Sequence, residues 1–149
     1  MEIPGEVTIP EHKHKLLEEN FFGVMSTLRA KDELISSNPV GYVWDGQRIR
    51  VSTLKSRVKY LNLQADSRIA FCVVSNTHVM DYVEIRGRAT LEDDPDHSFS
   101  REQFRRGTGG EEPPADMDPP GAERVIITIH PLQVSAPTLY DGRFDDRQK

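Results

Sequence analysis

Short apolar runs separated by turn residues dominate the pattern of hydrophobic and polar positions along this chain. Residues 21–28, 34–44 and 48–53 each have the length and composition of a strand. Asp45-Gly46 joins the last two of these segments, and Asp-Gly between apolar runs is a strong hairpin signal. Residues 68–75 are apolar on both faces, which predicts a strand covered on both sides.

A regular alternation of apolar and polar positions marks residues 82–91. Gly87 falls on the apolar face, where a missing side chain predicts a bend or the close approach of another backbone. A last strand is expected at residues 124–130, followed by Pro131 and a further extended stretch through Tyr140. The apolar face of the alternating segment carries Val83, Ile85, Ala89 and Leu91.

Helical patterns are few and short. Residues 10–20 open with proline and end near asparagine, and with only two apolar residues this helix is expected to be a lid and not a core element. Residues 56–65 have apolar side chains at helical spacing, and residues 96–106 are a third candidate. Residues 107–121 are rich in glycine, proline and acids, which predicts an exposed, flexible loop.

Six or more short strands with few helices favour a mainly β fold, an antiparallel sheet that closes or nearly closes into a small barrel. The length of 149 residues fits a single domain spanning 1–149, and 36% hydrophobic and 29% charged residues are typical of a globular protein. A small β-barrel is therefore the expected architecture.

Composition also narrows the function classes. The net charge of −5 argues against a nucleic-acid partner, which would require a basic surplus. Neither a membrane span nor a secretion signal is evident, so no membrane partner is expected. The single cysteine, Cys72, lies in an apolar run, which favours a buried packing role and a cytoplasmic location.

One segment has the opposite charge to the rest of the chain. Residues 47–64 contain no acid, and their five cations are Arg48, Arg50, Lys55, Arg57 and Lys59. Three of these cluster at the start of the predicted helix at 56–65, where the helix dipole disfavours positive charge. Free backbone N–H groups, together with the hydroxyls of Ser52, Thr53 and Ser56, would suit a phosphate there. The alternative is a solvated cationic helix start; the absence of a neighbouring acid favours phosphate.

The run Val51-Ser52-Thr53-Leu54-Lys55-Ser56-Arg57-Val58-Lys59-Tyr60-Leu61-Asn62 and its continuation Asp66-Ser67-Arg68 resemble the strand, turn and helix of the split-barrel flavin and deazaflavin oxidoreductases, which are related to pyridoxamine phosphate oxidase. Asn38-Pro39-Val40-Gly41 resembles the strand that passes the ring system in that family, and residues 83–91 resemble a later strand of it. The resemblance covers roughly residues 10–135. It departs at Ile85-Arg86-Gly87, where an acid is common before the glycine, and in the loop 107–121.

The resemblance implies a split β-barrel homodimer with two cofactor sites at the subunit interface. Arg57 and Lys59 of one chain would hold the phosphate, and Met80 and Tyr82 would come from the partner chain. The short form is typical of the deazaflavin branch, so coenzyme F420 is favoured and FMN is the alternative. The complete set of expected cofactor-binding residues is Pro39, Val40, Ser52, Thr53, Lys55, Ser56, Arg57, Val58, Lys59, Asn62, Met80 and Tyr82.

The expected function is hydride transfer between coenzyme F420 and an unidentified conjugated organic substrate. Because the ring supplies that chemistry, the sequence nominates no catalytic residue, and Tyr82 and Tyr140 are only candidates for substrate contact. Two alternatives remain: an FMN protein similar to pyridoxamine phosphate oxidase, and a non-catalytic module that carries a cofactor on the same fold.

Other signals carry less weight. His12 and His14 fall on different helix faces, and the remaining histidines lack a second ligand at useful spacing, so no metal site is expected. Residues 107–110 lack the lysine and the setting of a phosphate loop. Trp44 is interpreted mainly as a packing residue, with ring stacking as the alternative.

Overall fold

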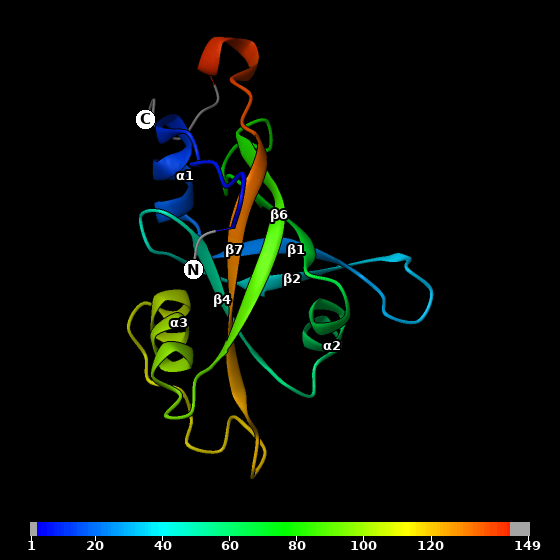
Figure 1. Cartoon of the computed structure of the whole chain (residues 1–149). Helices are drawn as coiled ribbons and strands as arrows, with labels where there is room; N and C mark the ends of the chain where they lie inside the picture. Colours follow the sequence, from blue (N-terminus) through cyan, green and yellow to red (C-terminus); the bar gives the residue numbers. More distant parts are fainter. Residues whose placement is uncertain (1–2, 144–149) are drawn as a thin grey trace.

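A single antiparallel sheet forms the frame of the molecule. The structure is a computed structural model, and it describes residues 3–143. Its seven strands are arranged in the order β2-β1-β5-β6-β7-β4-β3 and curl into a half-barrel with few short helices, so the predicted antiparallel split barrel is confirmed (Figure 1). The strands are β1 (Phe22–Leu28), β2 (Ile35–Gly41), β3 (Val43–Trp44), β4 (Ile49–Leu54), β5 (Arg68–Val74), β6 (Tyr82–Asp93) and β7 (Arg124–Ser135).

Three α-helices and two 3-10 turns complete the described residues. In Figure 1, α1 and α3 lie on one side of the long β6–β7 pair and α2 lies on the other. The helix α3 contacts β2 and β4, and α2 contacts β1. The bounds are η1 (Glu11–Lys13), α1 (His14–Glu19), α2 (Val58–Ala65), α3 (Ser98–Thr108) and η2 (Leu139–Gly142).

The core fills the inside of the curled sheet. Alternate residues of the central strands point inward, as period-two patterning requires. Fully buried side chains include Met25, Ile49, Val51, Phe71, Val83, Ile85, Ile127 and Ile129. The alternating strand is therefore confirmed, since Val83, Ile85 and Ala89 face the core and Leu91 packs against it partly buried.

The first helix corrects the expectation of a lid. Leu16 and Leu17 are 2% and 0% exposed and belong to the main core cluster. The hydroxyl of Tyr42 donates a 2.7 Å hydrogen bond to the carbonyl of Leu17, and the buried Lys13 lies 2.7 Å from Asp81. Two leucines are sufficient to make α1 part of the core, because the helix covers only one part of the barrel and the sheet forms the rest of its wall.

Two of the expected strands have different limits. The segment 34–44 is divided at Tyr42, whose backbone N–H donates to the carbonyl of Phe21 and not to a sheet partner in β4. The last strand does not end at 130, because β7 continues through Pro131. Proline is tolerated there because the β6–β7 register shifts at Arg86/Gly87, which removes the need for a regular donor.

The bulge also explains Gly87. A β-carbon at this position would lie 2.0 Å from the backbone oxygen of His130, so the predicted close approach of another backbone is confirmed. Glycine is required here because the backbone of His130 occupies the space that a β-carbon would need, at the position where the β6–β7 register shifts.

The strand β5 is covered on one face only in the described chain. Ile69, Phe71 and Val73 are buried, whereas Val74 is 38% exposed and Cys72 is half-buried. The expectation of cover on both sides is therefore wrong for the single chain, and Cys72 is only half-buried where a buried packing role was expected. The outer face of β5 is apolar but open.

Two absences apply to residues 3–143. No helix there combines the length and apolar character needed to cross a bilayer. Nor do three or more His, Cys, Asp or Glu side chains of these residues gather closely enough to hold a metal ion.

Candidate functional site

A polar hollow of 370 Å³ lies where the two ends of the curled sheet meet. The strand β2 is at one end of the sheet order and β4 is close to the other, yet the two contact each other. Six of the expected residues line this hollow: Pro39, Val40, Ser52, Thr53, Arg57 and Lys59. Asn38, Gly41, Leu54 and Arg124 complete its lining.

Local structure places Arg57 and Lys59 at the mouth of this hollow. The chain leaves β4 at Leu54 and turns, with the backbone N–H of Arg57 donating to the Leu54 carbonyl at 3.0 Å. Arg57 is the N-cap residue of α2 and has an extended backbone, so the helix begins at Val58 and not at Ser56. The turn directs both side chains toward β2 and β4.

Three of the five cations in the segment have carboxylate partners after all. Arg48 forms a two-point ion pair with Glu6, with a shortest separation of 2.5 Å. Arg50 lies 3.0 Å from Glu92. Lys55 lies 3.0 Å from Glu123 and 3.1 Å from Asp93. The argument from missing acids is therefore wrong for these three residues, because the acids arrive from other strands and loops.

Arg57 and Lys59 differ from the other three cations. Within residues 3–143 neither forms an ion pair with a carboxylate. The pKa of Lys59 is lowered from its ordinary value, first by burial and then by the positive charges of Arg57 and Arg124. Neighbouring cations that repel one another, as the partly buried Lys59 and the exposed Arg57 do, gain from a bound anion.

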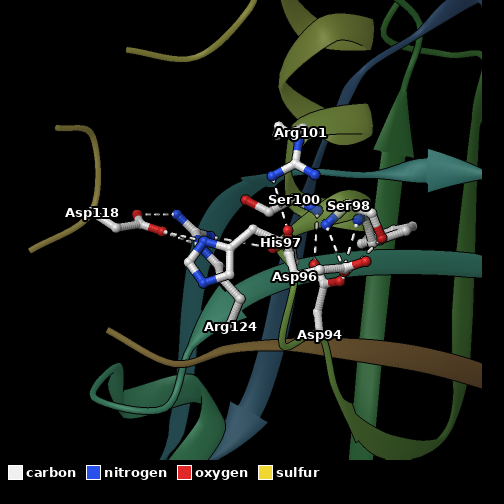
Figure 2. Close-up of polar contacts among 10 residues, drawn as sticks. Asp94, Asp96, His97, Ser98, Ser100, Arg101, Asp118 and Arg124 are labelled. Carbon is white, nitrogen blue, oxygen red and sulfur yellow. Dashed lines mark hydrogen bonds and ion pairs between the residues drawn. The ribbon is translucent and has the colours of Figure 1, made fainter. Parts of the chain in front are cut away.

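Arg124 is a residue of this site that the sequence did not reveal. It begins β7, pairs with Leu54 in the sheet register, and lines the hollow. Its Nη1 donates to the hydroxyl of Ser52 at 3.2 Å, while Nε and Nη2 contact the carboxylate of Asp118 at 2.8 and 2.6 Å (Figure 2). A basic residue at the start of the strand that pairs with β4 was the available signal, but strand pairing is not evident from sequence.

The helix α3 supports the strands beside the hollow. The backbone N–H of Ser52 donates to Oε1 of Gln103 at 2.8 Å. A β-carbon on Gly41 would lie 3.4 Å from Nε2 of the same glutamine. Gln103 thus lies between β4, to which it is hydrogen-bonded, and Gly41 of β2, where a side chain would meet it.

The start of α3 is secured by buried Asp94. Its carboxylate accepts from the backbone N–H of Ser100 at 3.0 Å and from that of Phe99 at 3.4 Å. His97, with a left-handed backbone at φ 59°, lies next to this cap and 3.6 Å from Asp118 (Figure 2). The helix that carries Gln103 is therefore fixed at its first turn.

Other expected cofactor-binding residues lie outside the lining of the hollow. Lys55 is engaged by Glu123 and Asp93, and Ser56 and Val58 are exposed beside the turn. Asn62 is buried on the other side of α2, where its amide donates to Thr27 at 3.1 Å and accepts from the backbone of Ala30 at 3.3 Å. The amide of Asn62 thus connects the helix to β1.

The three remaining candidates belong to other surfaces. Met80 precedes β6 and Tyr82 begins it, and neither lines the hollow of its own chain. Tyr140 lies in η2 and is 65% exposed.

Trp44 is a core residue. It is 6% exposed and its ring lies 5.1 Å from the ring of His14, which confirms its packing role.

The donor set fits a ligand with a phosphate and a flat polar ring. The guanidinium of Arg57 and the ammonium group of Lys59 are suited to the phosphate. The segments of β2 and β4 that line the hollow, with Gly41 and the hydroxyls of Ser52 and Thr53, are suited to the ring. The volume lies near the lower end of the range for small-molecule sites, roughly 300–1,000 Å³. The hollow is thus a candidate cofactor site.

Comparisons with solved structures support the same architecture. A structure titled F420 reductase is 32% identical, with a TM-score of 0.74, over 85% of this chain and 98% of the other. A conserved hypothetical protein from Mycobacterium tuberculosis is 20% identical, with a TM-score of 0.68, over 90% of this chain and 87% of the other. A putative pyridoxamine 5'-phosphate oxidase from Listeria innocua is 18% identical, with a TM-score of 0.61, over 82% and 92%.

The curated proteins include no significant match to this sequence. The family model described as pyridoxamine 5'-phosphate oxidase, however, matches residues 9–136, which include every strand and all the residues that line the hollow. The chain belongs to the pyridoxamine 5'-phosphate oxidase family.

Proposed function

We propose that this protein is an oxidoreductase that binds coenzyme F420 and passes a hydride between the deazaflavin and a conjugated organic substrate. The observation that carries the proposal is the pair of cations, Arg57 and Lys59, without carboxylate partners in residues 3–143, at the mouth of a hollow between β2 and β4. The 32% identity to a protein titled F420 reductase favours the deazaflavin.

The residues of the chain have binding and orienting roles in this proposal. Arg57 and Lys59 bind the phosphate, and Pro39, Val40, Ser52 and Thr53 form the walls along which the ring lies. Gln103 holds the backbone of Ser52 in place for that contact. When bound, the deazaflavin ring supplies the hydride chemistry itself, so the protein is required to bind, orient and exclude water.

FMN is the second candidate cofactor. The matching family model describes an oxidase of pyridoxamine 5'-phosphate, and the phosphate-binding cations suit the terminal phosphate of FMN equally well. A cofactor carrier without catalysis remains a third candidate, because fold alone does not fix function.

We further propose that two copies assemble through the outer face of β1 and β5. Phe22, Val24 and Val74 on these strands are 63%, 42% and 38% exposed, and Val74 pairs with Tyr82 on the neighbouring strand. Exposed apolar side chains on adjacent strands are typical of an interface. Covering this face would also cover a second hollow, of 480 Å³, lined by residues of β1, β2, β5, β6 and β7.

The decisive test is a titration of the purified protein with F420 and, separately, with FMN, following the fluorescence of the cofactor. Micromolar or tighter binding of F420 with weaker binding of FMN supports the proposal, and the reverse preference moves the protein to the flavin branch. No binding of either would reject the cofactor site.

The proposed assembly of two copies has its own test. Light scattering of the wild type and of a Phe22→Asp variant measures the oligomeric state, and a monomeric wild type would contradict the proposed assembly.

A further inference from the structure

We propose that Arg124 is a third phosphate-binding residue of the hollow, and that Asp118 holds its guanidinium in the direction that this role requires. The proposal rests on the proposed function, because it assigns a new residue to the same cofactor site. Asp118 lies in the loop of residues 109–123, between α3 and β7.

The ion pair of Arg124 and Asp118 is enclosed. The two side chains are 13% and 14% exposed, and both carboxylate oxygens accept from the guanidinium, at 2.8 and 2.6 Å. A two-point contact of this kind fixes the plane of a guanidinium as well as its position. In Figure 2 the carboxylate of Asp118 approaches from the loop side.

The other side of the same guanidinium reaches the hollow. Its Nη1 donates to the hydroxyl of Ser52, one of the residues that line the site. A guanidinium has five N–H groups, and the contacts with Asp118 and Ser52 use three of them. One hydrogen on each terminal nitrogen is therefore without a hydrogen bond in residues 3–143, and can donate to an anion.

The charges in the hollow agree with this assignment. Asp118 offsets one of the three cations, so Arg57, Lys59 and Arg124 retain a surplus of two positive charges. The effect of Arg124 on the pKa of Lys59 places both cations in one electrostatic environment. The surplus is sufficient to neutralise either the phosphodiester of F420 or the phosphate monoester of FMN.

A purely structural role would be the alternative. In that case Arg124 would only fasten the loop through Asp118, with His97 as a third, more distant contact at 3.6 Å. The two roles predict different binding behaviour. If Arg124 only fastens the loop, its replacement should change the affinity for ligands with and without phosphate equally.

The experiment measures the preference of the full, cofactor-free chain for a phosphorylated cofactor over its unphosphorylated form: FMN against riboflavin, and F420 against the phosphate-free deazaflavin that carries only a ribityl chain. Replacing Arg124 by Gln should reduce this preference by roughly tenfold to a hundredfold, the scale of a hydrogen bond to a charged group, with the affinity for the phosphate-free form unchanged. Arg124→Lys should restore part of the preference. The phosphate-free ligand also reports whether each variant is folded.

Matched variants separate the possible failures. Arg101→Gln removes a nearby exposed arginine that donates to the carbonyl of Asp96 and does not line the hollow, and it should leave the preference unchanged. Asp118→Asn should reduce the preference several-fold, and an unchanged or stronger preference would overturn the holding role. If Arg124→Gln keeps the full preference shown by the wild type, the proposal is wrong although the proposed function stands. If the wild type has no preference for phosphate, both are wrong.

Discussion

The cations of the segment 48–59 all have the same sign of charge, but in the structure they fall into two groups with different surroundings. Arg48, Arg50 and Lys55 are each engaged by carboxylates from distant parts of the chain. Arg57 and Lys59 have no such partner within the described residues and line the polar hollow. The first group is neutralised within the fold, whereas the second is available to a ligand.

The difference between the two groups follows from their positions along β4 and the turn after it, because different segments lie beside each position. Arg48 and Arg50 lie near its start, where the N-terminal segment and β6 supply Glu6 and Glu92. Lys55 follows its end, within reach of Asp93 and Glu123. After the next turn Arg57 and Lys59 line the hollow beside β2, and the carboxylate of Asp118 there is paired with Arg124.

The largest effect is expected from the ligand-facing pair. Lys59→Ala should weaken cofactor binding by roughly 1.5–3 kcal/mol, since it removes one hydrogen bond between charged groups. Arg57→Ala should have an effect of similar size, and Lys55→Ala, the control, should leave the affinity unchanged. Cofactor titration measures all three. Equal losses for Lys55 and Lys59 would remove the distinction between the two groups.

A smaller effect, on stability and not on binding, is expected from Arg48. Its side chain is 18% exposed and contacts Glu6, which also accepts from Nδ1 of His130 at 2.6 Å. Arg48→Ala leaves this carboxylate with one partner fewer, which should lower the free energy of unfolding by about 1–3 kcal/mol. Urea denaturation measures this change, with the exposed pair variant Arg29→Ala as control. A loss of cofactor affinity without loss of stability would contradict the assignment.

The pH dependence of stability should identify the same paired carboxylates. Arg48 lowers the pKa of Glu6 in the folded chain, and Arg124 lowers that of Asp118. The folded state therefore binds fewer protons than the unfolded state in the acid range. The resulting stabilisation is complete above the ordinary carboxyl pKa, about 4, and is lost as the pH falls through the lower folded values. Unfolding midpoints measured from neutral pH downward should be flat and then decline, and Arg48→Ala should decline less. A decline that begins near neutrality would point to other groups.

The smallest expected effect compares the two lysines chemically. The pKa of Lys59 is lowered by burial and neighbouring cations, whereas that of Lys55 is raised by its hydrogen bond to Glu123. At about pH 8 a larger fraction of Lys59 than of Lys55 is unprotonated, so Lys59 should react faster with an amine reagent. Peptide mapping after brief labelling measures both rates, and bound cofactor should protect Lys59 alone. Faster labelling of Lys55 would contradict the assigned environments.

Local signals predicted many parts of this fold correctly. The Asp45-Gly46 turn between β3 and β4, the alternation along β6 and the bend at Gly87 each depend on neighbouring residues or on a single missing side chain. The residues of β2, β4 and the start of α2 that line the hollow were named from two short stretches of sequence, 38–41 and 51–62, and their role as cofactor ligands stays a prediction. Arg124 could not be predicted, since its relevance depends on the pairing of β7 with β4.

The sequence by itself determined the period of each strand, the position of the turns and the five cations of one acid-free segment. The tertiary structure decided which cations are neutralised, because ion pairing depends on distances between strands remote in sequence. It also decided that Leu16 and Leu17 belong to the core, that Asn62 connects a helix to β1, and that Arg124 joins the hollow. Periodicity is a property of neighbouring residues, whereas the electrostatic environment of a charge is set by everything that folds around it.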